Sequence, residues 1–161
     1  MKVEKQHTTE EKTNVLYVDD EAHNLVSFTA TYRFKYNVFT AISGVEALSI
    51  LEENEIHILI TDQRMPGMTG VELLQRVIPS YPEILRILLT AYTDFEALKD
   101  AVNFGKIFAY MQKPWEEPIL SKNLEEADAI IKKSREEKEY AVRLAIINEQ
   151  FEFLLRQKLL S

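Results

Sequence analysis

The chain contains no cysteine among its 161 residues, which excludes disulfide bonds and zinc sites built from thiolates. Its three histidines, His7, His23 and His57, are scattered and form no group with metal-ligand spacing. No segment approaches the roughly 20 consecutive apolar residues of a membrane-spanning helix, and residues 1–13 are too polar for a signal peptide. We therefore expect a protein of the reducing cytoplasm that has no membrane segment.

Basic residues are in the minority. The sequence holds 19 Lys and Arg against 26 Asp and Glu, which gives a net charge of -7. This balance argues against direct binding of nucleic acid, because a phosphate backbone is bound by a basic surface. Hydrophobic residues make up 46% of the chain, enough to build a packed core. The length suits one domain with an appendage.

Glycine is also scarce, and no glycine occurs after Trp115. The only proline in this last segment is Pro118, at a place where the first turn of a helix tolerates proline. We expect one long helix or two in sequence, with a charged stretch over residues 132–139. Beyond it, apolar residues follow at alternating steps of four and three, the spacing of a coiled coil, so we predict a homodimer through this segment. These residues are Tyr140, Leu144, Ile147, Phe151 and Leu154.

Upstream of Trp115, short β-rich runs alternate with helical stretches, which favours a doubly wound α/β sheet of five parallel strands. The pairs Ser43-Gly44, Thr69-Gly70 and Thr93-Asp94 have the chemistry of helix N-caps. The predicted strands cover residues 15–18, 37–41, 56–61, 84–90 and 107–112. The predicted helices cover residues 21–34, 44–54, 69–79 and 94–103.

Polar side chains follow the predicted strands where each strand ends. Asp19 and Asp20 follow the first strand, Asp62 the third, while Thr90 and Lys113 close the fourth and fifth. The carboxyl ends of parallel strands share one rim of the sheet, so these side chains are expected to meet in one pocket. Three carboxylates so close together are unfavourable unless a divalent cation and an incoming anion compensate them. The pattern predicts metal-assisted phosphoryl transfer to a carboxylate, although each residue alone would indicate only a cap or a loop.

Asp62 is the candidate nucleophile, because it ends the most hydrophobic strand and precedes a turn over residues 65–67. Asp19 and Asp20 are the candidate ligands of Mg²⁺ (or Mn²⁺), which prefers hard oxygen atoms. The backbone carbonyl of Arg64 is a further candidate ligand.

Lys113 and Thr90 supply the remaining polar groups of the predicted pocket. Lys113 is expected to pair with a phosphoryl oxygen as a point charge. Thr90 is expected to donate a hydrogen bond from its hydroxyl. Both groups would act on the phosphoryl group rather than on the metal.

Taken in order, these motifs resemble the receiver domain of two-component response regulators over residues 14–129, about three-quarters of the chain. The resemblance implies a flavodoxin-like fold, with a receiver domain over residues 14–131. A flexible segment over 1–13 would precede it, and a helical linker or coiled-coil extension over 132–161 would follow it. The matching stretches are Leu16–Glu21, Thr61–Gly70, Leu88–Ala91 and Tyr110–Trp115.

The resemblance also implies what the pocket does. A sensor histidine kinase or a phosphotransfer protein would donate a phosphoryl group to Asp62. Mg²⁺ would be held by Asp20, Asp62 and the carbonyl of Arg64, with Asp19 assisting. Such a domain is a phosphoacceptor that dephosphorylates itself and is not a turnover enzyme.

Further expectations concern the neighbours of the phosphoryl group. In the family, Thr90 and Tyr110 would switch together when the aspartyl phosphate forms, and the Lys113–Pro114 peptide would be cis. Arg64 and Tyr92 would flank the phosphoryl group and restrict the approach of water. Because both side chains are bulky, we hypothesise a long-lived phosphoryl state.

Two other classes of protein share part of these features. Haloacid-dehalogenase-like phosphatases use similar groups, but they require a second acid two residues after the nucleophile, where this chain has Arg64. A coiled-coil adaptor would account for residues 140–154 and leave the pocket unexplained. No output motif follows the helical pattern that reaches Ser161. We therefore expect the receiver and linker of a longer regulator with an unidentified output domain, or else a stand-alone receiver with a dimerising tail.

Overall fold

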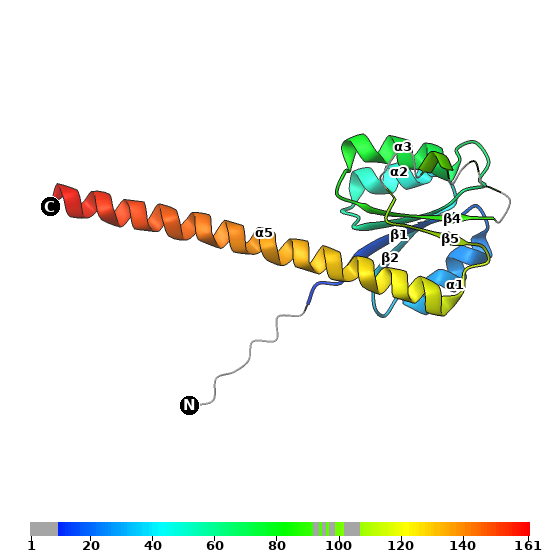
Figure 1. Cartoon of the computed structure of the whole chain (residues 1–161), viewed down its shortest axis with the longest axis horizontal. Helices are drawn as coiled ribbons and strands as arrows, with labels where there is room; N and C mark the ends of the chain where they lie inside the picture. Colours follow the sequence, from blue (N-terminus) through cyan, green and yellow to red (C-terminus); the bar gives the residue numbers. More distant parts are fainter. Residues whose placement is uncertain (1–9, 92–93, 95, 97–98, 102–106) are drawn as a thin grey trace, which may run out of the picture. The chain divides into compact units, whose positions relative to one another are not determined.

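The computed structural model describes residues 10–91, 94, 96, 99–101 and 107–161. Within them, five parallel strands form one sheet in the order β2-β1-β3-β4-β5 (Figure 1). The predicted α/β fold with a five-stranded parallel sheet is confirmed. The strands are β1 Asn14–Val18, β2 Asn37–Ala41, β3 Ile58–Asp62, β4 Leu85–Thr90 and β5 Ala109–Gln112.

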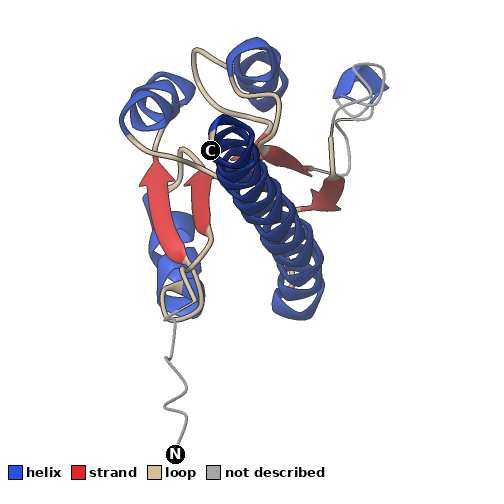
Figure 2. Ribbon diagram, turned by 90° about the vertical axis from the view of Figure 1, so that its left-hand side faces the viewer, coloured by secondary structure: helices blue, strands red, loops and turns tan. Residues whose placement is uncertain are grey.

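Helices cover both faces of the sheet (Figures 1 and 2). Helices α2 and α3 lie on one face and α1 on the other. The predicted helix over 94–103 falls largely outside the described residues, although Glu96 and residues 99–101 are helical. The helices that lie wholly within the described residues are α1 Ala22–Tyr32, α2 Gly44–Glu53, α3 Gly70–Ser80 and α5 Glu117–Leu160.

The three central strands are those with the most continuous apolar sequences. All five residues of β3 are buried, and β1 and β4 are buried except at their first residues, whereas the edge strands β2 and β5 are more exposed. Strands covered on both faces need apolar side chains on both, and each fully buried Leu or Ile contributes about 1.5–3 kcal/mol. In β1, Leu16 belongs to the core cluster that includes Leu51 of α2 and Leu74 of α3, while the Tyr17 ring meets Phe28 of α1.

Two of the predicted helix caps are present. The hydroxyl of Ser43 accepts a hydrogen bond from the backbone N–H of Glu46 at the start of α2. Thr69 and Glu72 form a reciprocal capping box at the start of α3. Such caps stabilise a helix by about 0.5–2 kcal/mol and fix where the chain leaves the sheet rim. Thr93 lies outside the described residues.

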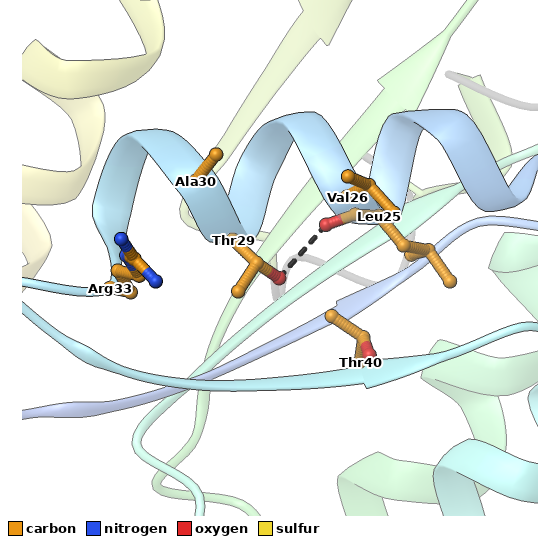
Figure 3. A pocket seen from close by; sticks show the side chains of 6 residues that line it. All are labelled: Leu25, Val26, Thr29, Ala30, Arg33 and Thr40. Atoms are coloured by element: carbon orange, nitrogen blue, oxygen red, sulfur yellow. Dashed lines mark hydrogen bonds between the residues drawn. The ribbon is translucent and has the colours of Figure 1, made fainter.

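A surface pocket lies between α1 and the edge strand β2 (Figure 3). The hydroxyl of Thr29 points along the helix and donates to the carbonyl of Leu25 at 2.9 Å. No carboxylate lines this pocket, so it is separate from the acidic residues at the strand ends. Its lining consists of Leu25, Val26, Thr29, Ala30, Arg33 and Thr40.

The chain divides into two compact units, residues 1–123 and 124–161. Helix α5 is continuous through both, so the C-terminal segment is one long helix and not two. In the second unit, the five apolar residues of the predicted coiled-coil seam are 42–65% exposed. In the parts of the chain that the structure describes, no helix combines the length and the apolar character needed to cross a membrane.

Candidate functional site

Three carboxylates gather at the carboxyl ends of the central strands. Val18 at the end of β1 pairs with Thr61 of β3, so the residues that follow, Asp19 and Asp62, emerge side by side. One carboxylate oxygen from each of Asp19, Asp20 and Asp62 lies within 4.8 Å of the others. Asp19 and Asp62 are buried, whereas Asp20 is exposed. The structure thus brings together the three acids that the sequence predicted.

Lys113 joins this cluster from the end of β5. Its Nζ lies 2.9 Å from Oδ2 of Asp62 and 3.0 Å from Oδ2 of Asp19. The backbone N–H of Lys113 donates to the carbonyl of Thr90 at 3.0 Å, which extends the pairing of β4 and β5 to the rim. The predicted cis peptide between Lys113 and Pro114 is confirmed.

Asp19 accepts four hydrogen bonds. Its Oδ2 accepts hydrogen bonds from the Tyr17 hydroxyl at 2.8 Å, the Asn24 amide at 3.1 Å and Lys113 Nζ at 3.0 Å. Its Oδ1 accepts a hydrogen bond from the backbone N–H of Glu21 at 2.9 Å. An ionised carboxylate offers about four lone-pair positions, so the hydrogen bonds use nearly the whole capacity of this side chain.

The two buried acids are shifted in opposite directions. Burial alone would raise the pKa of Asp19, but hydrogen bonds from Glu21, Lys113 and Tyr17 outweigh it and hold the pKa below its ordinary value. Burial raises the pKa of Asp62, the negative charge of Asp19 adds to this, and Lys113 offsets only part. For Lys113, burial is outweighed by hydrogen bonds to both acids, which raise the pKa of the ammonium. Lys113 therefore stays charged between them.

Two glycines shape the backbone after Asp62. Gly67 has a φ of 80°, a conformation that favours glycine, in the turn expected from the sequence. At Gly70, a Cβ atom would lie 2.4 Å from the carbonyl oxygen of Asp62. Glycine at position 70 thus lets the start of α3 approach the acid, a requirement that the sequence analysis did not identify.

Arg64 does not point freely toward the cluster. Its Nε and Nη2 atoms each lie 2.8 Å from an oxygen of Asp94 in a two-pronged ion pair. The Arg64 side chain is 67% exposed and that of Asp94 16%. The pair connects the loop after β3 to the loop after β4. Tyr92, the other predicted flanking residue, lies outside the described residues.

Thr90 and Tyr110 occupy neighbouring strands. Thr90 is the last residue of β4 and is buried, and its hydroxyl donates to the carbonyl of Ala91 at 3.1 Å. Tyr110 pairs with Leu88 in the ladder between β4 and β5, and its side chain is 54% exposed. An exposed aromatic ring on an edge strand is free to change position, which a buried ring is not.

Sequence reasoning missed the partners Tyr17, Asn24 and Asp94. Tyr17 fits an apolar strand as a β-forming residue, although it is the only hydroxyl-bearing side chain of β1. The contacts of Asn24 with Asp19 and of Asp94 with Arg64 had no signal in the sequence, because they depend on how loops and helices pack together.

The donor set fits a divalent cation of the Mg²⁺ or Mn²⁺ type, because three clustered carboxylates supply hard oxygen ligands. The adjoining ammonium of Lys113 adds a positive charge to the same rim. A cation at the acids and the ammonium together could hold an anion against Asp62.

Known proteins share this sequence and fold. The family model "Response regulator receiver domain" matches residues 15–125. The hydrogenase transcriptional regulatory protein HoxA of Cupriavidus necator is 38% identical over 107 residues, which cover 66% of this chain and 22% of HoxA. The chain thus spans less than a quarter of the length of this relative.

Solved structures agree with the sequence matches. The signal receiver domain of an HD domain-containing protein from Pseudomonas fluorescens Pf-5 superposes with a TM-score of 0.70 at 30% identity, covering 73% of this chain and 94% of that one. A CheY-like receiver domain protein from Methanospirillum hungatei JF-1 gives 0.69 at 28% identity, with coverages of 76% and 99%. Receiver domains are phosphoacceptors in phosphorylation-based signalling and not classical turnover enzymes. With this match over most of its length and with this fold, the chain belongs to the response regulator receiver domain family.

Proposed function

We propose that Asp62 accepts a phosphoryl group from a sensor histidine kinase or a phosphotransfer protein. The observation that carries this proposal is the position of Lys113, whose ammonium contacts both Asp62 and Asp19 in a rim of three carboxylates. The ammonium offsets part of the repulsion that an incoming phosphoryl group would meet. Asp62 is the acid that ends a strand and also contacts Lys113, so it combines a fixed position with charge compensation.

The transfer follows from these positions. A carboxylate oxygen of Asp62 attacks the phosphorus, a new O–P bond forms, and the P–N bond to the donor histidine breaks. The imidazole nitrogen leaves with the electron pair of that bond and takes up a proton. Lys113 turns from the carboxylates to an oxygen of the arriving group, and so keeps an anionic partner throughout.

Asp20, Asp62 and the carbonyl of Arg64 are the residues that would hold Mg²⁺ or Mn²⁺. A bound divalent cation neutralises negative charge on the phosphoryl oxygens. Asp19 already accepts four hydrogen bonds, so its contribution is support of the site through Lys113 and the backbone of Glu21. Asp20 is exposed and therefore available to a ligand arriving from solvent.

The phosphorylated state would act through Thr90 and Tyr110. The Thr90 hydroxyl now bonds to its neighbour's carbonyl, and an aspartyl phosphate would compete for it as a stronger acceptor. Movement of Thr90 would leave space that the exposed Tyr110 ring could occupy. The result is a change of surface on β5, which biases an attached or partner output.

The second unit would form a homodimer in the cytoplasm. Its seam of five large apolar side chains is exposed in the single chain, and each would gain about 1.5–3 kcal/mol on full burial, before the entropy of association. Two helices packed along this seam would cover all five. Transcriptional control, which the name of HoxA states for that relative, is a candidate output.

Comparing bound phosphoryl groups with released phosphate distinguishes a phosphoacceptor from a phosphatase. The chain is incubated with phosphoramidate and Mg²⁺, and protein-bound phosphoryl groups and released phosphate are both measured. We expect incorporation to level off at no more than one group per chain, with release limited by slow self-dephosphorylation. Fast, sustained release from a generic phosphate ester would contradict the proposal.

A further inference from the structure

Tyr17 lies in the middle of the buried strand β1, where its hydroxyl has a specific partner. The side chain is completely buried, and its hydroxyl donates to Oδ2 of Asp19 at 2.8 Å. A phenylalanine would serve the apolar packing of this strand equally well. The hydroxyl therefore has a role in holding the acid.

Trp115 is a neighbour of the same hydroxyl. An indole N–H is a donor only, so it can approach the Tyr17 oxygen and leave the single proton of Tyr17 for Asp19. The two rings are bridged by Phe28, whose centroid lies 4.6 Å from that of Tyr17 and 6.3 Å from that of Trp115. Trp115 and Tyr17 thus belong to one aromatic cluster beside Asp19.

Trp115 also contacts the elements that precede the long helix. Its ring lies 6.4 Å from that of Tyr32 at the end of α1, and the Tyr32 hydroxyl is 2.9 Å from Oγ of Ser121 in the first turns of α5. Trp115 follows Lys113 by two residues, and Lys113 is itself bound to Asp19. Asp19 is therefore connected to the start of α5 by side chains as well as by the backbone.

We propose that Tyr17 is a positioning residue for the metal and phosphoryl site, which holds Asp19 in place and transmits its state to Trp115. The proposal rests on the proposed function only in taking Asp19 as part of a cation site. If a cation were bound at the acids, Asp19 would change the hydrogen bonds that it accepts, the Tyr17 hydroxyl would follow, and the surroundings of the Trp115 indole would change. The same link works in reverse, so the Trp115 contact tunes the affinity of the site for the cation.

A purely structural role for Tyr17 makes a different prediction. Loss of a buried hydrogen bond would lower the free energy of unfolding and leave both cation affinity and the indole response unchanged. Partners in the second layer of a metal site, in contrast, typically change metal affinity by about 10- to 100-fold. Affinity and spectroscopic response therefore separate the two roles.

The test uses the whole chain and Mg²⁺ alone, with Tyr17→Phe as the variant and Tyr32→Phe as the matched control. Tyr32→Phe removes a hydroxyl from the same aromatic cluster, one that pairs with Oγ of Ser121. Because Trp115 is the only tryptophan, its indole N–H gives one resonance in a nitrogen-labelled sample. We expect this resonance to move during Mg²⁺ titration in the wild type and in Tyr32→Phe, and to stay fixed in Tyr17→Phe. Calorimetry should show about tenfold weaker Mg²⁺ binding for Tyr17→Phe only.

A second variant keeps the test informative if Tyr17→Phe does not fold. Trp115→Phe should also weaken Mg²⁺ binding, and in a foldable double variant it should add nothing to Tyr17→Phe, because both act through one contact. Wild-type affinity in both single variants, additive effects, or a wild-type indole resonance that ignores Mg²⁺ would overturn the proposal. None of these results bears on whether Asp62 accepts a phosphoryl group, which phosphoramidate labelling measures separately.

Discussion

The ammonium of Lys113 lies 2.9 Å from a carboxylate oxygen of Asp62 and 3.0 Å from one of Asp19, so one positive charge serves two buried acids. The third acid of the rim, Asp20, is exposed and relies on solvent. The site therefore keeps an excess of negative charge that a cation would neutralise. The proposed affinity of the rim for a divalent ion and its expected sensitivity to pH both follow from this imbalance.

Loss of Lys113 should destabilise the metal-free protein. We expect Lys113→Met to lower the free energy of unfolding at pH 7 by about 3 kcal/mol, because it leaves two buried carboxylates uncompensated. Urea unfolding in buffer with a chelator measures this value. In an Asp62→Asn background the same change should have a smaller effect, because one of the two acids is already neutral. Equal effects in both backgrounds would mean that Lys113 does not act through Asp62.

The two buried acids should titrate on opposite sides of the ordinary aspartate value of about 3.9 in the metal-free protein. The raised pKa of Asp62 means that the folded state binds its proton more readily than the unfolded state, so its ionisation reduces stability as the pH rises. The lowered pKa of Asp19 means that this acid stabilises the fold above about pH 4, and that the contribution is lost as the pH falls through its folded pKa. Carbon NMR of the side-chain carboxyl groups measures the titration curves of Asp19 and Asp62. Asp62 titrating below Asp19 would refute the assignment.

Arg64 and Asp94 should control how long the phosphoryl group survives. Asp94 holds the guanidinium in the unphosphorylated chain, and a phosphoryl group on Asp62 would compete for it. We expect Arg64→Ala to dephosphorylate about tenfold faster, the equivalent of one charge-assisted hydrogen bond, and Asp94→Asn to dephosphorylate more slowly because Arg64 is released. Decay of labelled protein measures both rates. An unchanged or slower dephosphorylation rate in Arg64→Ala would contradict the proposal that Arg64 shields the phosphoryl group from water.

The exposed seam of the second unit should control association. Ile147 is 56% exposed in the single chain and sits at the centre of the seam. Ile147→Asp would place a charge in the interface and should shift the chain to monomer in sedimentation velocity runs. Glu149→Gln, on a polar position of the same helix, is the control and should sediment like the wild type. If the wild type is monomeric at all concentrations, the proposed homodimer is wrong.

The sequence predicted the sheet and the acids for a physical reason. Continuous apolar runs become central strands, and the residues that follow parallel strands must share a rim, so the sequence alone places Asp19, Asp62 and Lys113 close together. The caps at Ser43 and Thr69 could also be predicted from the sequence, because each depends on residues a few positions apart.

Contacts between distant loops and elements could not be predicted in this way. Tyr17 and Trp115 are far apart in sequence, and their proximity depends on how β1, α1 and the segment after β5 pack together. The ion pair of Arg64 with Asp94 depends on two loop conformations, and nothing in either residue type indicates the other. The need for glycine at position 70 arises from a backbone approach that no local pattern reveals.

Mapping the modified residue decides whether Asp62 carries the phosphoryl group. The chain is treated with phosphoramidate and Mg²⁺, the acyl phosphate is reduced with borohydride, and peptides are examined by mass spectrometry. We expect homoserine at position 62 in the wild type, none in Asp62→Asn, and none in either protein when phosphoramidate is omitted. Modification at Asp19 or Asp20 in the wild type, or undiminished labelling of Asp62→Asn, would contradict the assignment to Asp62.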